Sequence, residues 1–299
     1  MSQAYSIIYD SASYDLAKGV AKDLGAGEDE MVEIIRTAFK DGEFKLRFSK
    51  EVKADEAVLV MRMYPNINDN VVALMFALSK LNSMGKSMRV VLPYLAYARQ
   101  DKEFLSGEVA SIYVIGDMMA HYGVKELVTI DVHSHDILGK LGVKVTNLSA
   151  SSMLAEYLQN SGSLSNPLVI SPDEGSIARS KIFAEYIGAD YAYLKKHRDR
   201  ATGEITTDEK ELDVKGREAI IFDDMIATGG TIVNAAKIAK SNGATKVLAV
   251  CTHALLIDGA SDKLKDAGVD SIITSNTISN SFAGIDVSAL ISKALQKDA

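Results

Sequence analysis

The chain has 299 residues, 47% of them hydrophobic and 24% charged, which is typical of globular protein and long enough for two domains with cores that need no disulfide bonds. Its single cysteine, Cys251, excludes an intramolecular disulfide and a cysteine-rich metal cluster. The net charge of −7 argues against a nucleic-acid partner, and the lack of a long apolar stretch or a signal-like start argues against a membrane one, so we expect a cytoplasmic protein.

Short apolar runs alternate with helix-length amphipathic stretches, which predicts repeated β-α-β units. In the first half we expect strands at residues 57–61, 89–93 and 127–132, with helices at 70–84 and 108–122 between them. The second half repeats the rhythm, with expected strands at 168–171, 191–195, 219–223 and 246–253 and helices at 151–158, 176–187 and 231–241. Several strands are apolar throughout, as in parallel sheets that helices cover on both faces. The predicted fold class is α/β with mainly parallel sheets.

The regular alternation is interrupted at two places. A polar stretch at 159–166 lies near the middle of the chain, and we place the domain boundary just before the preceding helix, near 147–150. Residues 197–218 have almost no apolar anchors and are expected to form a long structureless loop. Loops of that length in compact domains are usually either functional or disordered, and we interpret this one as a lid.

The most specific local motif is IIFDDMIATGGT at residues 220–231, an apolar strand with Asp223 and Asp224 at its end, followed by a small-residue turn that opens a helix. Backbone N–H groups at a helix N-terminus can surround a phosphate where side chains are small, so residues 228–231 suit a sugar phosphate. The two carboxylates could accept hydrogen bonds from ribose hydroxyls. The alternative is an acidic cap before a glycine turn.

Two further strand ends carry candidate metal ligands. Asp173 lies in SPDEGS at 171–176 and could bind Mg²⁺, although this sequence alone is also that of a simple turn. His133 lies in DVHSHD at 131–136, where the spacing matches no zinc signature and a structural histidine is equally compatible.

Two basic segments complete the set of candidates. Arg99, Gln100 and Asp101 follow an apolar strand and could contact an adenine or a phosphate. The run KKHRDR at 195–200 opens the long loop and includes Lys196 and Arg198. Such a run is usually a solvated basic patch, but its position opposite acidic strand ends makes a catalytic role plausible.

Taken together, these motifs resemble the ribose-phosphate pyrophosphokinase family over nearly the whole chain. Each motif alone is weak, whereas the full set in the same order is specific. The matching segments are FKDGE at 39–43, PYLAYARQD at 93–101, DVH at 131–133, SPDEG at 171–175, KHR at 196–198 and DDMIATGGT at 223–231.

The resemblance implies two tandem phosphoribosyltransferase-like domains, at 1–147 for ATP and 148–285 for ribose 5-phosphate, with a closing helix at 286–299 packed on the first. It implies transfer of the β,γ-diphosphoryl group of MgATP to the C1 hydroxyl of ribose 5-phosphate, with Mg²⁺ as cofactor, in a homo-oligomer whose subunits share the adenine site. The implied residues are Lys196 and Arg198 for catalysis; Phe39, Asp41, Glu43, Arg99, Gln100, Asp101 and His133 for ATP; His133 and Asp173 for the metal; and Arg198, Asp223, Asp224, Ala227, Thr228, Gly229, Gly230 and Thr231 for ribose 5-phosphate.

The chain departs from the family pattern at several positions. Ala227 replaces a common Asp and Ser176 a common second Gly, while Lys102 and Val132 replace the usual Arg and Leu. We expect the phosphate cradle to tolerate Ala227, because the cradle depends on main-chain N–H groups.

Two rival functions can be weighed against this one. A phosphoribosyltransferase uses a similar Asp-Asp…Thr-Gly loop, but it has no need of the segments around Arg99 and His133. A non-catalytic regulator on the same fold would bind nucleotides or phosphoribosyl pyrophosphate without turnover, and the retained Lys196, Arg198 and Asp173 argue against it.

Overall fold

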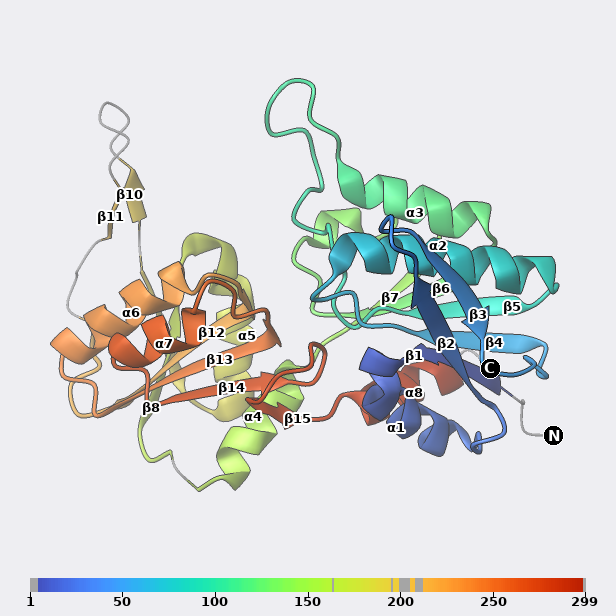
Figure 1. The fold of residues 1–299 in the computed structure, drawn as a ribbon. Coiled ribbons are helices and arrows are strands. Elements are labelled where there is room, and N and C mark those ends of the chain that lie inside the picture. The colour runs from blue at the N-terminus through green and yellow to red at the C-terminus, as the bar shows by residue number, and fades with distance from the viewer. Residues whose placement is uncertain (1–4, 163, 195, 199–204, 208–211, 298–299) are drawn as a thin grey trace. The chain divides into compact units, whose positions relative to one another are not determined.

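The computed structural model describes residues 5–162, 164–194, 196–198, 205–207 and 212–297 (Figure 1). The chain forms two compact units. The first consists of Met1–Ser149, Thr277–Ser279 and Asp286–Ala299, and the second of Ala150–Asn276 and Asn280–Ile285. Within the described residues, no helix has the length and apolar character needed to cross a bilayer.

The first unit is built on a seven-stranded sheet in the order β3-β2-β1-β4-β5-β6-β7. All neighbouring strands are parallel except β2 and β3, which form an antiparallel hairpin. The strands are β1 (Tyr5–Asp10), β2 (Met31–Ala38), β3 (Phe44–Phe48), β4 (Glu56–Val60), β5 (Ser87–Val91), β6 (Val124–Ile130) and β7 (Lys144–Leu148). The helices are α1 (Tyr14–Leu24), α2 (Ile67–Ser83), α3 (Ser111–His121) and α8 (Ser288–Lys297), with short 3₁₀ turns at Ser11–Ser13 and His135–Ile137.

The second unit holds a six-stranded, fully parallel sheet in the order β15-β14-β13-β12-β8-β9. Its strands are β8 (Pro167–Ser171), β9 (Asp190–Tyr193), β12 (Glu218–Ile226), β13 (Lys246–Ala254), β14 (Ser271–Ser275) and β15 (Ala283–Ile285). Its helices are α4 (Ser151–Asn160), α5 (Ile177–Ile187), α6 (Gly230–Ser241) and α7 (Ala260–Asp266), with a 3₁₀ turn at Glu174–Ser176 before α5.

The predicted α/β class with mainly parallel sheets is confirmed, and the expected helices and strands appear close to their predicted bounds. Apolar strands supply the cores because helices pack on both faces of each sheet; Val58, Leu59 and Val60 of β4, for instance, have no exposed surface. Figure 1 shows α2 and α3 on one face of the first sheet and α1 and α8 on the other.

The expectation of a structureless loop over residues 197–218 is wrong in part. Strands β10 (Lys196–Arg198) and β11 (Ile205–Thr207) pair antiparallel, with Lys196 opposite Thr207 and Arg198 opposite Ile205. The ladder supplies backbone hydrogen bonds that a polar segment without apolar anchors can still make. Leu194 before the ladder and Val214 after it are buried in the core of the second unit.

The C-terminal helix α8 is an integral part of the first unit. It packs against α1, and a Cβ placed on Gly19 of α1 would lie 2.4 Å from Ser288 Oγ, so only glycine permits this close approach. The buried Arg89 guanidinium of β5 donates from Nη1 to the Leu295 carbonyl of α8 at 2.6 Å, and it forms a salt bridge with Glu56. Arg89 thereby links helix α8 to the sheet of the first unit.

Candidate active site

The candidate site in the second unit lies where β12 extends beyond its neighbour β8. The pairing of β12 with β8 ends at Ile221 opposite Ile170, whereas its pairing with β13 continues to Ile226 opposite Ala254. Asp223 therefore lies inside β12 rather than at its end as expected, on the stretch that β8 leaves uncovered. A strand projecting beyond its neighbour opens space at the carboxyl edge of a parallel sheet, where ligands of α/β folds bind.

Asp223 and Asp224 are both largely buried, with side-chain exposures of 14% and 4%. Asp224 forms an ion pair with Arg179 of α5, whose Nη1 lies 2.5 Å from Asp224 Oδ1 and 3.8 Å from Asp223 Oδ1. Asp223 Oδ1 accepts hydrogen bonds from the Ser176 hydroxyl at 2.5 Å and from the Asp224 backbone N–H at 2.9 Å. The two carboxylates are thus held by different partners, one cationic and one neutral.

The electrostatics of this pair are unusual. Burial, and after it the adjoining carboxylate of Asp224, raise the pKa of Asp223 to about 7, although the hydrogen bond from Ser176 acts in the opposite direction. Carboxyl groups with a raised pKa beside a second carboxyl group are concentrated at functional sites, although ion-pair networks also produce them. The raised pKa therefore marks the pair as a candidate functional site.

Asp173 lies on the turn after β8, at the same edge of the sheet. Its Oδ1 accepts a hydrogen bond from the Ser176 backbone N–H at 3.2 Å, and its carbonyl accepts one from the Ser171 hydroxyl at 2.8 Å. Asp173 also raises the pKa of Asp223 by charge repulsion, after the larger effects of burial and Asp224. Ser176 therefore bonds to both strand-end carboxylates, through its main chain and its side chain.

The turn at residues 227–231 connects β12 to α6 as expected, and α6 begins at Gly230, one residue earlier than predicted. Gly229 precedes the helix with a φ of 77°, a left-handed conformation that glycine adopts without strain. Gly230 has no atom within 4 Å of an added Cβ, so space is open in front of the first helical N–H groups. Ala227 is half-buried and Thr228 exposed, while Thr231 lies in the first turn of α6. This arrangement provides the small-residue cradle that an anion requires.

A cavity of about 390 Å³ adjoins this cradle. It extends from Thr228 and Gly230 along the groove between α6 and α7, where Lys237 and Lys263 line it. Its lining therefore combines part of the predicted phosphate turn with lysines that the sequence did not single out.

In the first unit, Arg99, Gln100 and Asp101 follow β5, and His133 follows the neighbouring parallel strand β6, so both segments begin at one edge of the sheet. Arg99 and His133 are exposed, and Gln100 is half-buried. The Gln100 amide donates to the Lys102 carbonyl at 3.3 Å.

Both segments contain a non-glycine residue with positive φ just before the candidate side chains. Tyr97 has a φ of 66° and Asp131 a φ of 39°. The Tyr97 hydroxyl donates to Asn68 Oδ1, and the Asp131 backbone N–H donates to the Leu148 carbonyl at 2.8 Å. Strained backbone of this kind is concentrated at functional sites, and here it directs the chain away from the sheet.

Phe39, Asp41 and Glu43 lie in the tip of the β2–β3 hairpin, and all three are exposed. The Phe39 N–H donates to the Glu43 carbonyl at 2.7 Å, and Asp41 Oδ1 accepts from the Glu43 N–H at 3.1 Å. Phe39 is 48% exposed, which leaves its ring available to a ligand or to another chain.

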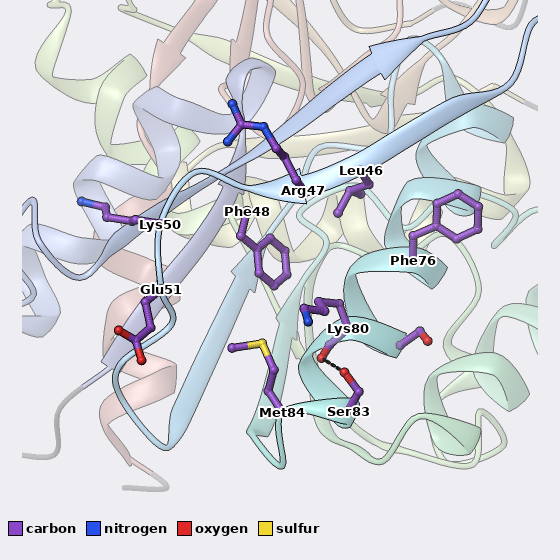
Figure 2. A pocket seen from close by; sticks show the side chains of 10 residues that line it. Leu46, Arg47, Phe48, Lys50, Glu51, Phe76, Lys80, Ser83 and Met84 are labelled. Carbon is purple, nitrogen blue, oxygen red and sulfur yellow. Dashed lines mark hydrogen bonds between the residues drawn. The ribbon is translucent and has the colours of Figure 1, made fainter.

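A cavity of about 680 Å³ in the first unit lies between β3 and α2 (Figure 2). Figure 2 shows Phe48 and Met84 on facing sides of it, with Lys50 and Glu51 on the segment after β3. None of the predicted site residues is among the residues that line it.

The carboxylates of the second unit provide hard oxygen donors of the kind that Mg²⁺ prefers. Among the residues that the structure describes, no group of three or more His, Cys, Asp and Glu side chains is arranged to hold a metal ion. Asp173 and His133 belong to different units. Because Mg²⁺ commonly keeps several waters and substrate phosphates, one or two protein ligands such as Asp173 fit its chemistry.

The sequence did not single out Arg179 as a site residue. It lies forty-four positions before Asp223 and reaches the carboxylates only because α5 packs beside β12. The signal that could have identified Arg179 is its position three residues after Ser176, because residues i and i+3 lie on one face of a helix.

Comparisons with known proteins cover nearly the whole chain. Residues 5–123 match the N-terminal domain of ribose phosphate pyrophosphokinase, and residues 205–297 match a phosphoribosyl synthetase-associated domain. A ribose-phosphate pyrophosphokinase of Methanobrevibacter smithii is 35% identical, with 97% of this chain and 99% of the relative covered. Ribose-phosphate pyrophosphokinase 2 of Archaeoglobus fulgidus is 38% identical over 93% of this chain and 95% of the relative. The crystal structure of phosphoribosylpyrophosphate synthetase from Mycobacterium smegmatis is similar with a TM-score of 0.86 and 25% identity, covering 99% of this chain and 100% of that one.

Proposed function

Because this chain belongs to the ribose-phosphate pyrophosphokinase family, we propose that it is a ribose-phosphate diphosphokinase, which transfers the β,γ-diphosphoryl group of ATP to the C1 hydroxyl of ribose 5-phosphate. The resemblance found in the motifs is thereby confirmed at the level of the family. The products are phosphoribosyl pyrophosphate and AMP. The observation that carries the proposal is the buried Asp223–Asp224 pair followed by the open turn at 227–231, in a chain whose relatives of this name align from end to end.

In this proposal the second unit binds the pentose phosphate. The first N–H groups of α6, with Thr228 and Thr231 beside them, would hold the 5-phosphate, since the space in front of Gly230 is open. Asp223 and Asp224 would accept hydrogen bonds from the ring hydroxyls. Both carboxylates are buried and held by partners, so they lose little conformational freedom when the sugar binds.

The first unit would bind the nucleotide through Arg99, Gln100, Asp101 and His133 at the edge beyond β5 and β6. The exposed hairpin tip with Phe39, Asp41 and Glu43 would complete the adenine site of a neighbouring subunit in a homo-oligomer. The exposure of Phe39 supports this. Its side chain is 48% exposed, and covering that apolar surface with another chain would stabilise the association.

The reaction joins the C1 oxygen of the sugar to the β-phosphorus, breaks the bond between that phosphorus and the α,β-bridging oxygen, and releases the hydroxyl proton. Lys196 and Arg198, on β10, would neutralise the charge that builds on the β-phosphoryl oxygens. Asp173 would hold Mg²⁺, which would supply charge neutralisation of the polyphosphate, and His133 would contact the nucleotide. No covalent intermediate on the chain is needed, since phosphoryl transfer depends mainly on positioning and charge.

The test is an assay of purified protein with ATP and ribose 5-phosphate, with and without Mg²⁺. We expect equal amounts of AMP and phosphoribosyl pyrophosphate, formed only with the metal. Binding of both substrates without AMP would instead indicate a non-catalytic regulator. Consumption of phosphoribosyl pyrophosphate with a free base would indicate a phosphoribosyltransferase.

A further inference from the structure

Ser176 is the residue through which the two acidic strand ends of the second unit are connected. It is 4% exposed and is the N-cap residue directly before α5, at the end of the 3₁₀ turn Glu174–Ser176. Its backbone N–H donates to Asp173 Oδ1 at 3.2 Å, and its hydroxyl donates to Asp223 Oδ1 at 2.5 Å. A hydroxyl that donates to a carboxylate at this distance forms a strong, charge-assisted hydrogen bond.

The hydrogen bond from the Ser176 hydroxyl determines the orientation of the Asp223 carboxyl group. The Asp224 backbone N–H reaches the same oxygen at 2.9 Å, so Oδ1 has two donors from different directions. One donor is the backbone N–H of the adjacent residue, Asp224. The other is the hydroxyl of Ser176, which lies in the turn directly before α5. Two donors on one oxygen fix the rotation of the carboxyl group, and only the bond from Ser176 requires a second element of the fold.

We infer that Ser176 is a positioning residue that orients Asp223 to accept the pentose hydroxyls. This inference rests on the function proposed above. It predicts that the hydroxyl contributes to sugar recognition and not to recognition of the phosphate, which the main chain at 228–231 would hold.

The helix offers a matched control one turn away. Ser180 is fully buried on α5, and its hydroxyl donates to the Phe222 carbonyl of β12 at 3.2 Å. Ser180→Ala removes a buried hydroxyl between the same two elements without touching a carboxylate. Ser176→Ala keeps the backbone N–H that bonds to Asp173, so the turn retains its cap.

The experiment measures the dissociation constants of ribose 5-phosphate and of inorganic phosphate by calorimetry, and the KM values of both substrates, for wild type and the two variants. We expect Ser176→Ala to weaken ribose 5-phosphate binding about fivefold, which equals a hydrogen bond of roughly 1 kcal/mol. Phosphate binding and the KM for ATP should stay at wild-type values. Ser180→Ala should change the melting temperature and none of these constants.

Three results would overturn the inference. Unchanged or tighter ribose 5-phosphate binding in Ser176→Ala would show that the hydroxyl does not orient Asp223 for the sugar. Equal losses of phosphate and sugar binding, or equal effects of the two variants, would show a purely structural role. A wild-type protein that forms no phosphoribosyl pyrophosphate and binds no ribose 5-phosphate would overturn the proposed function itself, and the inference with it.

Discussion

Each unit places its candidate residues at the carboxyl edge of its own parallel sheet, but the two units hold these residues by different means. In the first, Arg99 and His133 are exposed and follow backbone with positive φ at Tyr97 and Asp131. In the second, Asp223 and Asp224 are buried and held by side chains of α5. Exposed polar side chains suit a flexible polyphosphate, whereas a rigid sugar ring is better recognised by preorganised acceptors.

The units also use arginines of different burial in different ways, since the Arg89 side chain is buried and that of Arg179 is only partly buried. In the first, Arg89 joins β5 to Glu56 of β4 and to the C-terminal helix. In the second, Arg179 pairs with a candidate site residue, Asp224. One arginine therefore stabilises the architecture of its unit, and the other stabilises charge within a site.

The strongest test of this contrast is Arg89→Met. It removes the cation that pairs with Glu56 and with the neighbouring buried Glu126, which keeps the half-exposed Lys144 nearby, and it removes the bond to the Leu295 carbonyl. We expect the free energy of unfolding to fall by about 3–5 kcal/mol, as when one partner of a buried pair is deleted. Chemical denaturation measures it, and the KM for ribose 5-phosphate at low temperature should not change.

Lys144→Met is the control for this experiment. It removes a half-exposed lysine that lies 3.2 Å from the same Glu126, and exposed pairs contribute at most about 1 kcal/mol. A loss as small in Arg89→Met as in Lys144→Met would contradict the structural role given to Arg89.

The second test addresses the chemistry assigned to β10. Lys196→Ala removes a cation proposed to stabilise the transferring group, and losing such a contact typically lowers kcat by about 100-fold or more. Steady-state AMP formation measures it, with little change expected in the melting temperature. Lys181→Ala, on the exposed surface of α5, is the control for loss of a lysine. Wild-type turnover in Lys196→Ala would remove this residue from the mechanism.

The third test uses the raised pKa of Asp223. Its pKa is about 7 in the folded chain, against 3.8 ordinarily, so between these values the folded state keeps a proton that the unfolded state releases. The resulting stabilisation is complete below about pH 4 and is lost as the pH rises to about 7, at up to roughly 1.4 kcal/mol per pH unit. Asp223→Asn, whose amide oxygen can still accept the bonds from Ser176 and Asp224, should show a shallower decline in unfolding free energy. Urea unfolding at several pH values between 5 and 8 measures how the unfolding free energy changes with pH. Equal slopes in the wild type and in Asp223→Asn would contradict the raised pKa of Asp223.

The sequence was most informative where its signals were local. Apolar runs predicted β4, β5, β6, β8, β12 and β13, because buried parallel strands have that composition. No element was predicted before residue 57, although the Asp-Gly turn at 41–42 between β2 and β3 is a hairpin signal. The Asp223–Thr231 motif was predicted as a site because its residues are contiguous. Arg179 was not, since only the packing of α5 on β12 brings it to Asp224.

The smallest effects should come from substitutions at the two glycines at the start of α6. Together they distinguish the effect of backbone conformation from the effect of an added methyl group. Gly229→Ala forces a side chain into a left-handed φ of 77° and should cost about 1 kcal/mol of stability. Gly230→Ala places a methyl group where nothing lies within 4 Å, so its stability should equal or slightly exceed that of the wild type. That methyl group enters the space assigned to the 5-phosphate, and the KM for ribose 5-phosphate should therefore rise. Thermal unfolding and steady-state kinetics on both variants measure the two quantities, and an unchanged KM in Gly230→Ala would move the phosphate away from this turn.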